Sequence, residues 1–318
     1  MIKFTTIRLV LDVATAKAWP LKQLDVNNAF LQGKLTEEVY MSQPPGFIDI
    51  DRPSYVCRLK KPIYGLKQAQ RAWYTTLKQY LLCSGFVNSV ANTSLFIHTS
   101  GHNITYVLLY VDDIIVTRNN NVVVNKFFSS FVERFSIKDL SDLHSFLGIE
   151  VNQIAKGLHL MQQKYITNLL IKHNMLDAKP VTTPLPTSPQ LILDSGDPLP
   201  NASQYRSIVG SLQYISFTRT DISFAVNKLS QFVHKPTHEL LQAAKRVLRY
   251  LAGTITQSIF LHASSPMTLH AFLDADWTCD TNDKISINGY IIYLGSNPIS
   301  WSSRKQRGVA RSSFESEY

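Results

Sequence analysis

Acidic side chains are scarce in this sequence, and one long segment has none. The 318 residues contain 23 Asp and Glu against 32 Lys and Arg, which gives a net charge of +9 at pH 7. No Asp or Glu occurs between Arg52 and Val111. A chain of this charge favours an acidic partner, such as nucleic acid or an anionic membrane, although charge alone fits a merely basic soluble protein equally well.

Cysteine is also rare, and long apolar runs are missing. The three cysteines, at positions 57, 83 and 279, form no C-x-x-C pair, which argues against a disulfide framework or zinc site and fits a reducing compartment. No apolar run approaches the roughly 20 residues of a membrane span. Arg8 and Asp12 interrupt the apolar N-terminal stretch, unlike a secretion signal. We therefore expect an intracellular protein, cytoplasmic or nuclear, that is neither secreted nor membrane-bound.

The composition and the local patterns indicate a globular chain with several domains. Apolar residues make up 45% of the chain and charged residues 17%. Six prolines fall within 180–200, which predicts an extended linker because proline fixes φ and removes a donor. Apolar residues at helical spacing then predict a helix between a capping Thr237 and Gly253. Alternation predicts strands in 268–275 and 289–301.

Basic and aromatic side chains are interleaved in the acid-free segment. Lys60, Lys61, Lys67 and Arg71 lie among tyrosines and Trp73. Basic side chains neutralise phosphates and aromatic rings stack on bases, so the segment is a candidate nucleic-acid surface. The alternative is a solvated basic face beside ordinary core aromatics.

Two adjacent acids end the acid-free segment. Asp112 and Asp113 separate two β-rich apolar runs in 104–117, which predicts a hairpin with the acids at or near its tip. Aspartate favours turns in any case, but adjacent carboxylates repel one another, and a bound divalent cation would offset that repulsion. Asp25 lies near the end of a predicted strand at 21–26 and is the candidate third ligand.

Several segments together resemble one family. YVDD at 110–113, with LDV upstream at 24–26, is similar to the palm of a reverse transcriptase. The other segments that resemble copia-type retrotransposon polyproteins are MSQPPGF (41–47), VCRLKKPIYG (56–65), YGLKQAQRAWY (64–74), FLGIEV (146–151), YRSIVGSLQYI (205–215), RTDISFAVN (219–227) and AAKRVLRYLAGT (243–254). FLDADW (272–277) and ISWSSRKQ (299–306) resemble the same family's ribonuclease H. The match is colinear and covers nearly the whole chain.

The resemblance implies an α+β fold. It contains a reverse transcriptase palm and thumb with truncated fingers, a helical connection and an incomplete ribonuclease H-like domain. The expected domains are the partial fingers and palm at 1–155, the thumb at 156–183, the Pro-rich linker at 184–204, the helical connection at 205–264 and the N-terminal part of the ribonuclease H-like domain at 265–318.

The resemblance also implies an activity, RNA-directed DNA polymerisation. Its substrates would be deoxynucleoside triphosphates, and its partners an RNA template, a DNA primer and an RNA–DNA hybrid. Asp25, Asp112 and Asp113 would hold two Mg²⁺ ions, or Mn²⁺, about 3.5–4 Å apart, for in-line attack of the primer 3′-hydroxyl on the nucleotide. Mg²⁺ prefers such oxygen ligands.

Further residues take roles from the same resemblance. Phe30 would act as a steric gate against ribonucleotides, although a phenylalanine near a strand end is otherwise more often a core residue. Gln68 would contact the incoming nucleotide. The basic residues expected to contact nucleic acid are Lys60, Lys61, Lys67 and Arg71.

A second, partial site is implied near the C-terminus. Asp274 matches the first carboxylate of ribonuclease H, and Glu317 matches the glutamate on its following helix. The two further aspartates of that site would lie beyond Tyr318, and two carboxylates are too few to place both ions. We therefore expect no ribonuclease H activity from this chain.

Some positions depart from the family pattern. Asn27 and Asn28 stand where lysine and threonine are usual, Gln70 replaces a common proline, and Arg118 stands where glycine is common. Such departures are typical of a drifting copy. Two hypotheses remain: a polymerase fragment, in a cytoplasmic virus-like particle or the nucleus, or a catalytically dead remnant that binds nucleic acid.

Overall fold

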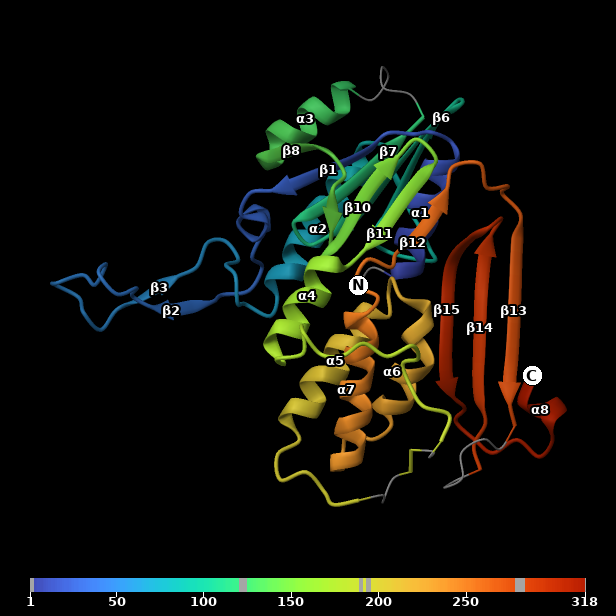
Figure 1. Cartoon of the computed structure of the whole chain (residues 1–318). Helices are drawn as coiled ribbons and strands as arrows, with labels where there is room; N and C mark the ends of the chain where they lie inside the picture. The colour runs from blue at the N-terminus through green and yellow to red at the C-terminus, as the bar shows by residue number, and fades with distance from the viewer. Residues whose placement is uncertain (1–2, 120–124, 189–190, 193–195, 278–283, 318) are drawn as a thin grey trace. The chain divides into compact units, whose positions relative to one another are not determined.

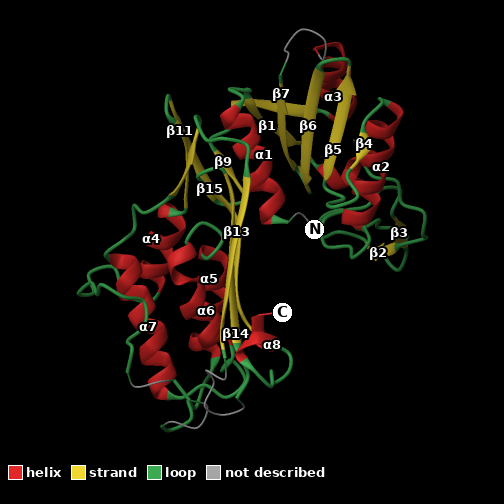
Figure 2. Ribbon diagram, turned by 90° about the vertical axis from the view of Figure 1, so that its right-hand side faces the viewer, coloured by secondary structure: helices red, strands yellow, loops and turns green. Residues whose placement is uncertain are grey.

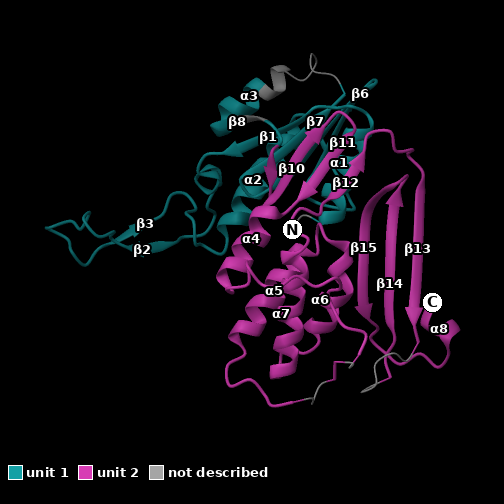
Figure 3. Cartoon of the chain, viewed as in Figure 1, with its two compact units in different colours: residues 1–143 teal, residues 144–318 magenta. Residues whose placement is uncertain are grey.

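Two compact units make up the chain, residues 1–143 and residues 144–318 (Figure 3). The computed structural model describes residues 3–119, 125–188, 191–192, 196–277 and 284–317, and Cys279 lies outside these ranges. Each unit combines helices with antiparallel sheets, so the expected mixture of helices and strands is confirmed. In the described ranges, no helix is long and apolar enough to cross a membrane.

A six-stranded antiparallel sheet forms the centre of residues 1–143 (Figures 1 and 2). In spatial order its strands are β4 (Val87–Asn88), β5 (Leu95–Ser100), β6 (Asn103–Tyr110), β7 (Asp113–Arg118), β1 (Leu21–Val26) and β8 (Ile137–Asp142). The strand predicted at 21–26 and the hairpin predicted in 104–117 are both confirmed. Since β1 lies between β7 and β8, segments far apart in the sequence meet in the middle of the sheet.

Two helices cover one face of this sheet, α2 (Ala69–Cys83) and α3 (Asn125–Phe135). Their residues in the shared core include Trp73, Leu77, Leu81, Phe131 and Phe135. The strand residues in that core include Leu24 and Val26 of β1 and Ile114 and Val116 of β7. Because side chains alternate along a strand, the residues next to these core residues project to the other face of the sheet. Asp25 and Asp113 are two of them.

The remaining elements of this unit flank the sheet. They are α1 (Phe4–Ala16), the short 3₁₀ helix η1 (Ala29–Gln32), and a separate two-stranded sheet of β2 (Tyr40–Ser42) and β3 (Val56–Arg58). Figure 1 shows the two-stranded sheet as an arm that extends away from the six-stranded sheet. The chain returns from this arm into α2, so the basic segment around Lys60 and Lys61 joins the arm to the core.

Residues 144–318 contain two further antiparallel sheets. One consists, in spatial order, of β12 (Ile259–His262), β11 (Gly157–Met161), β10 (Ile149–Ile154) and β9 (Ser145–Phe146). The other consists of β13 (Leu269–Asp276), β14 (Ile287–Leu294) and β15 (Asn297–Lys305). The strands predicted in 268–275 and 289–301 are confirmed. β13 is an edge strand, and nearly all of its residues are exposed.

Helices build the largest core of this unit. They are α4 (Gln163–Lys172), α5 (Ser203–Ile215), η2 (Thr220–Ile222), α6 (Ser223–Ser230) and α7 (His238–Ala252), and a short α8 (Ser313–Glu317) follows the last sheet. The predicted helix is confirmed as α7: the Thr237 hydroxyl accepts the N–H of Leu240 at 3.4 Å, and Gly253 follows its last turn. Figure 2 shows α4 to α7 gathered beside the long strands.

The described residues of the proline-rich segment 180–200 form no helix or strand, as the sequence predicted, but the last two residues of the expected linker, Ser203 and Gln204, begin α5. The segment is nevertheless attached to the helical core. Its leucines that pack there are Leu185, Leu191 and Leu199. Arg249 Nε donates to the Lys179 carbonyl at 2.7 Å, and Arg246 donates to the Thr183 hydroxyl at 3.0 Å. Two basic side chains of α7 therefore hold the start of the linker.

The cap of α7 can be tested by mutation. Thr237→Ala should lower the free energy of unfolding of residues 144–318 by about 0.5–2 kcal/mol, because the N–H of Leu240 loses its acceptor. Urea unfolding followed by circular dichroism measures this change. Thr237→Ser keeps the oxygen and is the matched control. An equal loss in both variants would assign the effect to packing of the threonine methyl group instead.

Candidate active site

The register of β1 against β7 brings two of the predicted acids together. Asp25 lies directly opposite Asp113, the first residue of β7. Directly opposed residues of antiparallel strands project to the same face, with Cβ atoms about 4.5–5.5 Å apart. The two carboxyl groups are therefore neighbours in space.

The third acid lies in the turn between β6 and β7. Tyr110 pairs with Asp113, so Val111 and Asp112 form a two-residue turn, and the acids lie at the tip of the hairpin as predicted. The N–H of Val26 donates to the carbonyl oxygen of Asp112 at 3.0 Å. β1 thus binds the turn through this hydrogen bond, in addition to pairing with β7. The side chain of Asp112 is exposed.

The electrostatics of the three acids are unfavourable in the absence of a cation. Burial raises the pKa of Asp113 above its ordinary value, and the charge of Asp112 raises it further. The amide of Gln23, whose Nε2 lies 3.4 Å from Oδ1 of Asp113, lowers this pKa, and the charge of Asp25 adds a smaller increase. In the part of the chain that the structure describes, no three His, Cys, Asp or Glu side chains are arranged to hold a metal ion. The site therefore presents concentrated negative charge to a cation, but its carboxylates do not form a complete set of metal ligands.

A lysine that the sequence did not single out lies on the other side of Asp25. β8 pairs with β1 so that Lys138 is directly opposite Asp25. Asp113, Asp25 and Lys138 therefore form a row across three neighbouring strands, on one face of the sheet. No motif marks Lys138, and only the pairing of β8 with β1 reveals it.

A cavity of about 480 Å³ lies beside the turn. Its walls include Phe30, Tyr64, Gln70, Val111 and Asp112. Phe30 comes from η1, directly after β1, and its ring packs on Tyr64 with the centroids 5.7 Å apart. The predicted gate residue and one predicted metal ligand thus share one cavity.

Gln70, and not Gln68, belongs to the wall of this cavity. Gln68 is the N-cap residue of α2, whereas Gln70 is exposed one residue inside the helix and also lines a neighbouring cavity. The nucleotide contact expected of Gln68 stays a prediction. Sequence comparison missed Gln70 because it is a departure from the family pattern.

The four predicted nucleic-acid-binding residues are all exposed. They are Lys60, Lys61, Lys67 and Arg71. Among the described residues they take part in no salt bridge. Their charges are accessible to phosphate groups, and the role itself stays a prediction.

The two predicted ribonuclease H residues lie in the last sheet and helix. Asp274 is exposed on β13, opposite Gly289 of β14, and Glu317 is exposed at the end of α8. The Ser312 hydroxyl accepts the N–H of Glu315 at 3.1 Å and caps the start of α8. The catalytic roles of Asp274 and Glu317 stay predictions.

Comparison with known proteins decides the family. The family described as reverse transcriptase (RNA-dependent DNA polymerase) matches residues 1–187. The chain belongs to the reverse transcriptase family. The resemblance to copia-type retrotransposon polyproteins is thereby confirmed. Enzymes of this family take a nucleic-acid template and deoxynucleoside triphosphates and use divalent metal ions.

Relatives of this reverse transcriptase region occur in plants and yeast. The retrovirus-related Pol polyprotein from transposon RE2 of Arabidopsis thaliana is 59% identical over the whole chain, which spans 22% of that polyprotein. The corresponding polyprotein from transposon TNT 1-94 of Nicotiana tabacum is 35% identical over the whole chain, which spans 25% of it. A transposon Ty5-1 protein of Saccharomyces cerevisiae is 33% identical over 93% of the chain and 97% of its own length. The chain thus spans about a fifth to a quarter of the two plant relatives.

The raised pKa of Asp113 predicts a pH-dependent gain in stability from its removal. Asp113→Asn should stabilise residues 1–143 at neutral pH, because asparagine has no charge to desolvate or repel. The carboxylate destabilises the fold where it is ionised, and this effect disappears as the pH falls toward the ordinary pKa of 3.8. Thermal melts without divalent ions should therefore show a positive difference in Tm at neutral pH that shrinks on acidification.

Asp51→Asn, in an exposed residue of the arm, is the control for this measurement. It should show no such pH-dependent gain. A lower Tm for Asp113→Asn at neutral pH would contradict the electrostatic account.

Proposed function

We propose that this chain carries the polymerising site of an RNA-directed DNA polymerase, with Asp25, Asp112 and Asp113 as its metal ligands. The observation that carries the proposal is the register that sets Asp25 opposite Asp113, with Asp112 in the adjoining turn. Carboxylates from a central strand and a hairpin tip converge there, although the sequence separates them widely.

The chemistry of the three donors suits Mg²⁺. All three side chains offer oxygen, which Mg²⁺ and Mn²⁺ prefer. The raised pKa of Asp113 reflects, after burial, repulsion from Asp112 and Asp25 that cations would relieve. When bound, such ions lower the pKa of the primer 3′-hydroxyl and neutralise the triphosphate.

The residues around the acids would position the nucleotide. Phe30 would lie under the sugar and exclude a 2′-hydroxyl, with Tyr64 supporting its ring. Gln70, together with the predicted Gln68, would contact the incoming nucleotide from the start of α2. Lys138 would place a positive charge beside Asp25, where it would help to neutralise the negative charge of the triphosphate.

The exposed basic residues would bind the template and primer. Lys67 and Arg71 flank the first turn of α2, next to Gln70, and Lys60 and Lys61 lead to it from the arm. Basic side chains of this kind bind a phosphate backbone without regard to sequence. An RNA template, a DNA primer and their hybrid are the proposed partners, and an intracellular location follows from them.

The domain organisation proposed from the sequence has the partial fingers and palm in 1–155, the thumb in 156–183 and a partial ribonuclease H-like domain in 265–318. β11 and α4, which fall within 156–183, suit a primer-holding thumb. The exposed β13, with its carboxylate at Asp274, suits the first strands of a ribonuclease H-like sheet.

Primer extension on an RNA template with Mg²⁺ tests the polymerase. Asp112→Asn should lower extension by at least about 10³-fold, because loss of one metal ligand removes more than about 4 kcal/mol of transition-state stabilisation. Template affinity should change little, because phosphate contacts by exposed basic side chains supply most of the affinity for a nucleic-acid backbone.

Asp197→Asn, in an exposed residue of the proline-rich segment, is the matched control and should keep full activity. Template binding with no extension in the wild-type chain would favour the alternative, a catalytically dead remnant that binds nucleic acid. Extension that survives Asp112→Asn would refute the assignment of the site.

The gate can be tested separately. Phe30→Val should raise the use of ribonucleoside triphosphates relative to deoxynucleoside triphosphates by about tenfold or more, because a smaller side chain leaves room for the 2′-hydroxyl. Single-nucleotide extension with each class of nucleotide measures the ratio. Phe47→Val, in an exposed arm residue, should leave the ratio unchanged. An unchanged ratio in Phe30→Val would show that Phe30 is an ordinary core residue.

A further inference from the structure

The turn that carries the acids has an unfavourable backbone. In the two-residue turn between Tyr110 and Asp113, Val111 has a φ of +52°. Positive φ at the first turn position alone is the pattern of a type II′ turn, which favours glycine there. For a β-branched side chain this conformation is an outlier. Strained backbone of this kind persists only where surrounding groups hold it in place.

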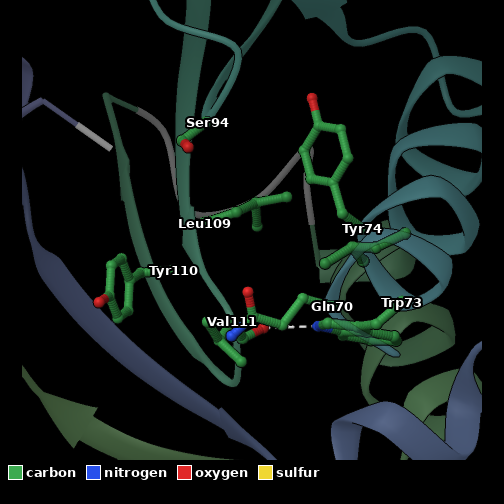
Figure 4. A pocket seen from close by; sticks show the side chains of 8 residues that line it. Gln70, Trp73, Tyr74, Ser94, Leu109, Tyr110 and Val111 are labelled. Carbon is green, nitrogen blue, oxygen red and sulfur yellow. Dashed lines mark hydrogen bonds between the residues drawn. The ribbon is translucent and has the colours of Figure 1, made fainter. Parts of the chain in front are cut away.

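One side chain holds the strained residue directly. Trp73 Nε1 of α2 donates a hydrogen bond to the carbonyl oxygen of Val111 at 2.5 Å, drawn as the dashed line in Figure 4. The Trp73 side chain is itself fixed: it is 2% exposed, and its ring meets Phe135 edge-on with the centroids 5.4 Å apart. α2 therefore presents an immobile donor to the turn.

The two carbonyl groups of the turn are held from different sides. The Val111 oxygen binds Trp73 of α2, and the Asp112 oxygen binds the N–H of Val26 of β1. Between them these bonds fix both peptide groups that carry the acids. Loss of either bond would free the turn to relax toward a backbone that suits valine.

A cavity lies beside the turn, on the side from which Trp73 donates its hydrogen bond. Tyr74, Leu77, Leu109 and Gln70 line a cavity of about 430 Å³ that reaches Val111 (Figure 4). Trp73 lines the same cavity, and its hydrogen bond reaches the Val111 peptide from α2. This bond is a directional restraint on that peptide, which loose packing beside a cavity does not supply.

We propose that Trp73 is a positioning residue, whose indole N–H holds the Val111 carbonyl so that the strained turn keeps Asp112 and Asp113 at the site. This role rests on the proposed function only for its effect on catalysis. The effect on the turn itself is a structural property and can be measured without activity.

Hydrogen exchange followed by mass spectrometry tests the restraint on the full chain. Trp73→Phe keeps an aromatic ring but removes the N–H, and should raise exchange in peptides covering 24–27 and 110–113 by about tenfold. Phe135→Leu disturbs the ring contact of Trp73 but keeps the N–H, and should leave these peptides much closer to wild type. Equal loosening in both variants, or unchanged exchange in Trp73→Phe, would overturn the proposal.

A second variant separates the hydrogen bond from general packing. Val111→Gly relieves the positive φ, so the turn should no longer depend on Trp73. Trp73→Phe should therefore raise exchange at 110–113 much less in the Val111→Gly background than in wild type. An equal increase in both backgrounds would mean that Trp73 acts only through the core. The double variant also keeps the test open if Trp73→Phe alone folds poorly.

Primer extension supplies the catalytic readout. Trp73→Phe should lower kcat for nucleotide addition by about tenfold or more while the KM for the nucleotide changes little, because the acids of the turn move while Phe30 and Tyr64 in the opposite cavity wall do not. Val111→Gly should restore part of the loss. A chain that extends no primer at all would refute the proposed function, and the exchange measurements would still decide the role of Trp73.

Discussion

The pairing of β1 with β7 is the constraint on which the site depends. It sets Asp25 opposite Asp113 and allows Val26 to hold the turn at Asp112. Carboxylates this close repel one another, and burial of Asp113 increases the penalty. The hydrogen bonds and apolar contacts of a six-stranded sheet, with helices packed on its other face, keep them together. The fold thus maintains a concentration of negative charge at the place where we propose the metal ligands.

Residues 144–318 contain an acid whose charge is balanced by neighbouring side chains. Arg219 is almost fully buried and binds Asp221 through two nitrogens, and the Tyr250 hydroxyl also donates to Asp221. Burial raises the pKa of Asp221, but the hydrogen bonds and charge of Arg219 outweigh it and keep that pKa below its ordinary value. This acid is satisfied by the protein itself, so it stabilises the fold. Asp113 has no such cationic partner among the described residues, and its raised pKa makes it a candidate for function.

The turn between β6 and β7 combines a strained backbone at Val111 with repulsion between neighbouring carboxylates. Val111 adopts a backbone conformation that is disfavoured by about 1–2 kcal/mol for a residue with a Cβ, next to three acids. The surrounding structure supplies the compensation: Trp73 from α2, Val26 from β1 and the core beneath them. A stable scaffold with an unfavourable site is expected where function, and not stability, selects the local residues.

Local signals in the sequence determined much of this protein. Alternation and capping residues predicted the hairpin in 104–117 and the helix from 238 to 252, because hydrogen bonds and side-chain periodicity of these elements are short-range. The YVDD and LDV motifs also singled out the three acids. Only the tertiary structure decided that Lys138 lies beside Asp25, that Gln70 lines the cavity, and that Trp73 holds Val111. Each of these depends on strand register or helix placement, and contacts between segments far apart in the chain leave no periodic pattern in either segment alone.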